Sequence, residues 1–157
     1  MNVINKPQSV LLVHSGKKLL PLSTLAFTVS SGKKSKVEQL YLNSIVIFRN
    51  GEIKKIDRIN FLGFWGKTIW WKLLSFANGG VRSIAIEFLD LPKINFFDIK
   101  QMVLSGYQED RKSTNSFFNK DIPLSKVLSD INISTNCAEL FDAIGMPNPD
   151  HLLDILC

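Results

Sequence analysis

Short apolar runs separated by polar turns fill the first third of the chain and predict β-strands. Residues 9–14 (SVLLVH) are an apolar run of strand length. A turn over 15–18 separates them from a second apolar run over 19–29. Pro21 interrupts this second strand and cannot donate a ladder hydrogen bond, which places the strand at the edge of a sheet.

A basic segment and then the strongest hairpin signal of the chain follow. Residues 30–36 (SSGKKSK) are expected to form a flexible loop, and 37–48 a third strand. Asn50 and Gly51 lie between apolar-rich runs and predict a two-residue type I′ turn, because both residue types tolerate positive φ. The turn leads into a fourth strand over 52–60.

A two-residue turn fixes the register of the hairpin and sets Arg49 opposite Glu52, a pair of opposite charge. The fourth strand departs from strict alternation, because isoleucine recurs every three residues at Ile53, Ile56 and Ile59. A β-bulge near 54–55 would reconcile this spacing with a strand.

The most aromatic helix of the chain is predicted over 67–77. All three tryptophans, Trp65, Trp70 and Trp71, lie in or beside it. Large aromatic residues at helical spacing usually bury, so we expect this helix in the core. Trp71 is the expected exception, since Trp70 and Trp71 cannot both face the same way. An aromatic recognition surface is the alternative.

The remaining sequence predicts one more strand and then helices. Residues 81–89 alternate apolar and polar positions, as a half-buried strand does. The polar segment 108–120 is expected to be a loop whose Phe117-Phe118 pair tucks onto the core. Helices are expected over 96–107, with Asn95 as N-cap, and over 124–131, 136–144 and 150–156. Strands first and helices later predict one α+β domain: an antiparallel sheet of about five strands with helices on one face.

Composition and charge narrow the classes of protein. A hydrophobic content of 45% with 21% charged residues is typical of a globular domain. The net charge of +5 hides an asymmetry: residues 121–157 hold six acidic residues against Lys126 alone. We therefore divide the chain into a β-rich basic part over 1–107, the loop 108–120 and an acidic helical tail over 121–157. No apolar run is long enough to span a membrane.

Candidate catalytic chemistry is sparse. The two histidines are His14 and His151, and the two cysteines are Cys137 and Cys157. Their spacing matches no metal site or disulfide framework, and no phosphate-binding or nucleophile motif is present. We expect no enzyme activity, no cofactor and no metal, and we expect a reducing, cytoplasmic compartment.

Seven basic residues in predicted turns and exposed strand positions form the candidate partner-binding surface: Lys33, Lys34, Lys36, Arg49, Lys54, Lys55 and Arg58. The first hypothesis is a protein-binding module, a small bacterial antagonist of the immunity type that occludes the active site of a toxin. An acidic partner would meet the basic surface, whereas a basic toxin would meet the acidic tail. The alternative is RNA binding through 17–58, with Tyr41, Phe48, Phe61 or Phe64 stacking on bases.

Overall fold

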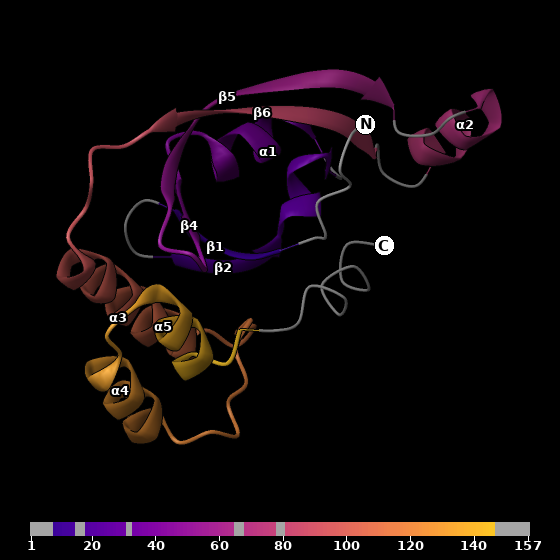
Figure 1. Cartoon of the computed structure of the whole chain (residues 1–157). Coiled ribbons are helices and arrows are strands. Elements are labelled where there is room, and N and C mark those ends of the chain that lie inside the picture. The colour runs from indigo at the N-terminus through magenta and orange to yellow at the C-terminus, as the bar shows by residue number, and fades with distance from the viewer. Residues whose placement is uncertain (1–7, 15–17, 31–32, 65–67, 78–80, 147–157) are drawn as a thin grey trace.

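The computed structural model describes residues 8–14, 18–30, 33–64, 68–77 and 81–146, so the helix expected over 150–156 lies outside the described residues. The fold is α+β, as the sequence predicts (Figure 1). The strands are β1 (Ser9–His14), β2 (Lys18–Ser23), β3 (Val29–Ser30), β4 (Ile45–Phe48), β5 (Ile53–Phe64) and β6 (Arg82–Asp90). The helices are α1 (Lys34–Tyr41), α2 (Ile69–Ala77), α3 (Phe96–Lys112), α4 (Leu124–Ile133), α5 (Cys137–Ala143) and the short 3-10 helix η1 (Thr24–Phe27).

The six strands form one antiparallel sheet in the order β2-β1-β4-β5-β6-β3. The two edge strands, β2 and β3, are consecutive in the chain and are joined by η1. The sheet therefore curls until its edges approach each other, and α1 lies inside the curl (Figure 1). Because of this curl, the sheet has an inner face that holds α1 and an outer face that other helices cover.

Strand β1 is buried on both faces, which explains its unbroken apolar run. Val10 and Leu12 face the inner core, whereas Leu11 and Val13 face the outer core. The inner core lies between the curled strands, η1 and α1 and consists of Val10, Leu12, Leu20, Phe27, Val37, Tyr41, Val46, Ile56, Ile59 and Ile84.

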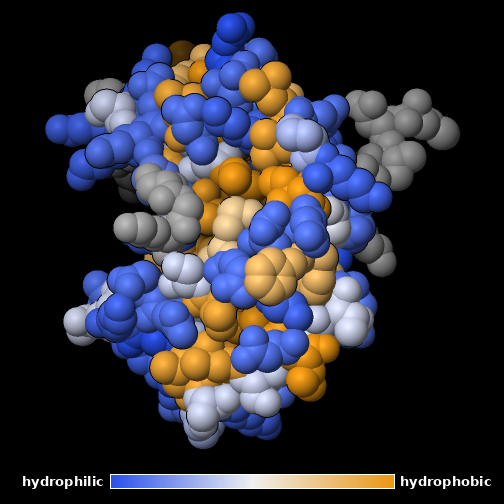
Figure 2. Space-filling view, turned by 90° about the vertical axis from the view of Figure 1, so that its left-hand side faces the viewer, coloured by the Kyte–Doolittle hydropathy of each residue, from blue (hydrophilic) through white to orange (hydrophobic). Residues whose placement is uncertain are grey.

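The outer core lies between the sheet and the layer made by α3, α4 and α5. Leu11, Val13, Leu19 and Ile47 supply the sheet side of this core. The helices supply Ile99, Val103, Tyr107, Val127, Ile131, Cys137, Leu140, Phe141 and Ile144, and Phe118 adds to them from the loop after α3. On the face shown in Figure 2, apolar side chains continue from the sheet into the helical layer.

The hairpin between β4 and β5 has a different turn from the one that the sequence predicts. The loop has three residues, because Ile47 pairs with Ile53 and the N–H of Gly51 donates to the carbonyl of Phe48 at 2.9 Å. Gly51 has φ of +89°, while Asn50 does not have positive φ. This is a type I turn followed by a left-handed glycine, so the predicted type I′ turn and its register were wrong.

The predicted bulge exists but lies further along β5. The pairing with β6 shifts at Asp57 and again at Leu62, not near 54–55. An extra residue at Asp57 puts Ile56 and Ile59 on the same face, where both join the inner core. Ile53 packs instead against the outer core. The three-residue spacing of isoleucine therefore has two causes: Ile53 and Ile56 face opposite sides of the sheet, and the bulge at Asp57 keeps Ile56 and Ile59 on the same side.

Two predicted segments have a different structure. The third strand was expected over 37–48, but α1 occupies its first part, where Val37 and Tyr41 bury one turn apart. The second strand was expected over 19–29, but it ends at Ser23, and η1 carries the chain across to the other edge of the sheet.

The helical layer follows the sequence closely. Helix α3 begins at the predicted N-cap, where the side chain of Asn95 accepts a hydrogen bond from the N–H of Phe97. It continues to Lys112, five residues beyond the predicted end. Of the Phe117-Phe118 pair, Phe118 is buried as expected and Phe117 is exposed.

Helix α3 crosses strand β2 at Gly106, and this close approach gives a stability prediction. A Cβ atom at position 106 would lie 2.4 Å from the Cγ of the fully buried Leu19. Overpacking costs about 1–3 kcal/mol, while replacing a helical glycine by alanine returns up to about 1 kcal/mol. Gly106→Ala should therefore lower the free energy of unfolding by about 1–2 kcal/mol in urea titrations.

The neighbouring exposed position provides the control for this measurement. Ser105→Ala adds no atom to the helix–strand contact and should leave the unfolding midpoint nearly unchanged or slightly raised. A Gly106→Ala variant as stable as the Ser105→Ala variant would show that α3 does not pack this tightly on β2.

Candidate docking surface

Helix α2 is the most exposed apolar element in the described part of the chain. Trp70 exposes 73% of its surface and Ile69 72%, and Trp71, Leu73 and Leu74 each expose more than half. The helix lies beyond the ends of β5 and β6, on the opposite side of the molecule from α3, α4 and α5 (Figure 1). The expectation that Trp70 is part of the core was therefore wrong, because no layer among the described residues covers this helix. Trp71 is exposed as expected, and Trp65 lies outside the described residues. The alternative, an exposed aromatic surface, agrees with the structure.

The exposed side chains cover more than a stripe of the helix. At about 100° per residue, the five positions spread over roughly 200° of the circumference. A helix that packs on a globular core needs an apolar stripe of only about 100°. Helix α2 therefore exposes a continuous apolar surface of the kind that marks interaction sites.

Arg82 lies at the junction between α2 and the sheet. It is the first residue of β6, and it pairs with Ser30 of β3 on one side and with Phe64 of β5 on the other. Its guanidinium carbon is 5.2 Å from the centre of the Phe64 ring. Arg82 is half-buried, and its charge therefore lies on an aromatic face close in the chain to α2.

Three lysines lie near this junction at the start of α1. Lys33 is three residues from Ser30, so it is within about 11 Å of the strand that pairs with Arg82. The Nζ atom of Lys34 is 5.1 Å from the centre of the Phe61 ring of β5. Lys36 lies in the same helical turn, and all three side chains are exposed. We call Lys33, Lys34, Lys36 and Arg82 the basic collar, and α2 with the basic collar the docking end.

The structure does not bring the seven predicted basic residues together on one surface. Lys33, Lys34 and Lys36 belong to the basic collar. The others are spread along the hairpin, and three of them pair with acids: Arg49 with Asp142 at 2.5 Å, Lys54 with Glu52 at 3.0 Å and Arg58 with Glu87 at 3.8 Å. Lys55 is half-buried at a position between Ile45 and Leu89. The expected pairing of Arg49 with Glu52 is replaced because the three-residue loop changes the register.

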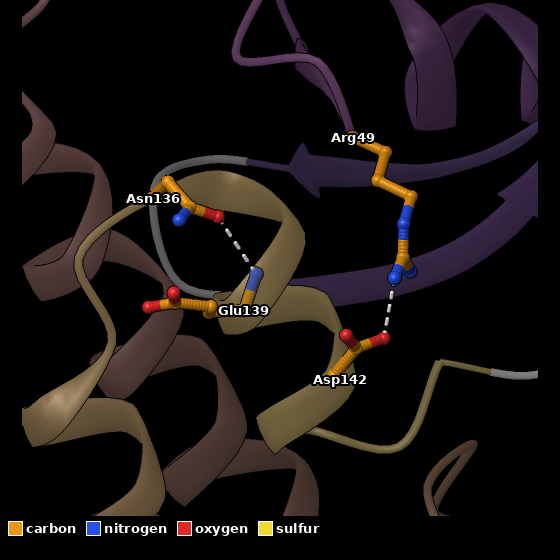
Figure 3. Close-up of polar contacts among 4 residues, drawn as sticks. All are labelled: Arg49, Asn136, Glu139 and Asp142. Carbon is orange, nitrogen blue, oxygen red and sulfur yellow. Dashed lines mark hydrogen bonds and ion pairs between the residues drawn. The ribbon is translucent and has the colours of Figure 1, made fainter.

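Arg49 links the hairpin tip to the helical layer (Figure 3). Helix α5 begins at Asn136, whose side chain accepts a hydrogen bond from the N–H of Glu139 at 3.0 Å. The Glu139 carboxylate accepts hydrogen bonds from the backbone N–H and the hydroxyl of Thr135, and these bonds hold its pKa below the ordinary value. Asp142 lies one turn further along and receives Arg49. This pair positions the tip and is remote from the docking end.

His14 contacts a buried serine that sequence reasoning did not connect with it. The Nδ1 atom of His14 is 3.0 Å from the Oγ of Ser44, and this Oγ donates to the carbonyl of Leu40 at 2.9 Å. A hydroxyl has one proton, so Ser44 accepts from His14 and cannot be deprotonated by it. The contact therefore ties β1 to the end of α1 and does not activate a nucleophile.

The other candidate residues lie in core positions or outside the described residues. Cys137 is buried in the outer core, and burial raises the pKa of its thiol. Tyr41, one of the aromatic residues considered for base stacking, is buried in the inner core, and burial raises the pKa of its hydroxyl. His151 and Cys157 lie outside the described residues.

Comparison with known proteins gives no relative: no protein-family model, no curated protein and no solved structure matches the chain. Within the described ranges, no three His, Cys, Asp or Glu side chains group as metal ligands. In the same part of the chain, no helix has the length and apolar character that crossing a membrane requires.

The His14–Ser44 contact gives a prediction about stability. Ser44→Ala removes the acceptor of the His14 ring and the donor to Leu40, both in a part-buried site. An unsatisfied buried polar group costs about 1–3 kcal/mol, so the free energy of unfolding should fall by that amount. Ser129→Ala, at an exposed helical position, is the control and should be nearly neutral. Equal stability of the two variants would refute the structural role of Ser44.

Proposed function

We propose that this chain acts by docking and not by catalysis, and that the docking end is the surface it uses. The observation that carries the proposal is the exposure of five large apolar side chains on α2. Fully burying one side chain of this size is worth roughly 1.5–3 kcal/mol. Folding leaves most of this free energy unused at α2, so a partner that covers the helix gains it on binding.

The two parts of the docking end have different roles in this proposal. Tryptophan and leucine side chains supply contact area, and tryptophan is the residue type most enriched among residues that dominate binding energy. The basic collar supplies a positive potential beside the contact area, which accelerates encounter with a negatively charged partner. The body of the fold holds α2 away from the two cores.

Antagonism of a toxin is the second candidate function, and the spacing of α2 favours it. Trp70, Leu73 and Leu74 stand at positions i, i+3 and i+4, which is how an amphipathic helix anchors in the groove of another protein. An immunity-type protein would use these anchors to occlude the active-site cleft of a toxin with an acidic rim. Support for RNA binding comes mainly from the basic collar. Of the four aromatic residues considered for base stacking, Tyr41 is buried, Phe48 and Phe61 are half-buried against the inner core, and Phe64 is half-buried beneath Arg82.

If α2 is the docking surface, substitutions of its exposed apolar residues should weaken partner binding without lowering the stability of the fold. The double variant Trp70→Ser/Leu74→Ser should lose the partner in pull-down experiments from the cells that make the protein. Its melting temperature should change little, because both side chains already expose more than half of their surface. The pull-down is run with and without nuclease, and protein, lipid and nucleic acid are each identified in the eluate.

A matched control lies on the other side of the molecule. Phe97→Ser/Ile133→Ser also replaces two exposed apolar residues, on α3 and α4. This control variant should retain the partner. If the α2 variant and the control variant bind equally well, the docking end is not the binding surface. A loss of captured nucleic acid at raised salt, with α2 intact, would move the function to phosphate binding by the basic collar.

A further inference from the structure

We infer that the docking end binds the surface of an anionic lipid bilayer, with α2 lying in the interface and the basic collar on the lipid headgroups. This inference rests on the proposed function and names the partner of the same surface. It is carried by three observations: the width of the apolar surface of α2, its tryptophans, and the distribution of charge in the molecule.

The apolar surface of α2 suits a lipid phase better than a protein groove. A groove receives one stripe of a helix and leaves the rest in water. Here the exposed apolar positions spread over roughly 200° of the circumference at about 100° per residue. In a bilayer interface, acyl chains can contact the underside and both flanks of such a helix, because they adapt to its shape.

The residue types and the length of α2 fit a position in the interface. Tryptophan is enriched at the boundary between headgroups and acyl chains. There its apolar ring contacts the acyl chains while its N–H donates a hydrogen bond to the headgroup region. Trp70 and Trp71 are adjacent in α2 and both are exposed. The nine residues of α2 span about 14 Å, less than half of a hydrocarbon core of about 30 Å. The helix can therefore lie on the bilayer, and this mode needs no span.

The charges nearest to α2 are of one sign in the sequence. Residues 58–86, which contain α2 and its flanks, hold four basic residues and no acidic residue. Residues 1–37, which lead into α1, also hold no acidic residue. The three lysines of the basic collar lie at the N-terminus of α1, and the first turn of this helix contains no acidic residue. The positive end of the helix dipole therefore adds to their positive potential.

Acidic residues outnumber basic ones in the helical layer on the other side of the molecule. Residues 96–143, which contain α3, α4 and α5, hold seven acidic and five basic residues, and the excess comes from the acidic tail. This layer is remote from α2 (Figure 1). A negatively charged membrane therefore attracts the docking end more strongly than the helical layer, which turns α2 toward the lipid.

Vesicle binding tests the inference on the full chain. The protein is sedimented with vesicles of phosphatidylcholine alone and with vesicles that also contain phosphatidylserine, at low and at high salt. We expect binding at least about tenfold stronger to the anionic vesicles, since each basic residue near the surface adds about 1 kcal/mol. All three tryptophans fall within residues 65–71, so tryptophan emission should shift to shorter wavelength on binding.

Two double charge reversals separate the basic collar from net charge. Lys33→Glu/Lys36→Glu should weaken binding to anionic vesicles about tenfold or more. Lys93→Glu/Lys126→Glu changes the net charge equally at two exposed positions outside the docking end, and it should retain most of the binding. Trp70→Ser/Leu74→Ser should abolish the emission shift and the binding. Equal losses in the two charge variants would overturn the role of the basic collar.

The outcomes distinguish this inference from the proposed function. Binding to neither kind of vesicle, or equal binding to both, overturns the anionic bilayer as the partner. If the α2 variant then still loses a protein in the pull-down, the docking role stands and the partner is that protein. If the α2 variant behaves as wild type in both experiments, the inference and the proposed function fail together.

Discussion

The double burial of β1 is the constraint on which the rest of this structure depends. Its inward residues meet α1 and η1, and its outward residues meet the helical layer, so one strand of six residues belongs to both cores. A strand with this position cannot alternate between apolar and polar residues, and its sequence does not. The sheet can then curl around α1 without losing its contact with α3, and the far ends of β5 and β6 extend beyond both cores.

Where the sequence predicted the structure, the signal was local. β1, β6, the N-cap at Asn95 and the start of α5 all follow from patterns within about ten residues. Local signals failed where a contact across the fold decides the structure. Valine and tyrosine are residue types that favour strands, yet Val37 and Tyr41 lie in a helix. There, their side chains are one turn apart and both are buried in the inner core.

The docking end was only partly predictable for the same reason. The lysines of the basic collar were identified from the sequence. Their position near α2 could not be, because it depends on the pairing of β3 with β6 across the sheet. The exposure of α2 could not be inferred, because aromatic residues at helical spacing look the same whether they face a core or a partner. One clue was available in the sequence: the segments that flank α2 contain basic residues and no acidic residue, and burial of the helix would not require this pattern.

The outer edge of β6 has a consequence for association between copies of the chain. Strand β3 pairs with the first two residues of β6, and the N–H of Ile84 donates to the carbonyl of Thr28. Within the described residues, no other strand covers the edge beyond Ile84. An uncovered strand edge is a template for growth into fibres. Glu87, which pairs with Arg58, and Asp90 lie along this stretch. A second copy that approached edge to edge in an antiparallel register with Glu87 opposite Asp90 would bring carboxylates close together. In the described part of the chain, this β-edge is thus open, and its acidic residues oppose self-assembly in that register.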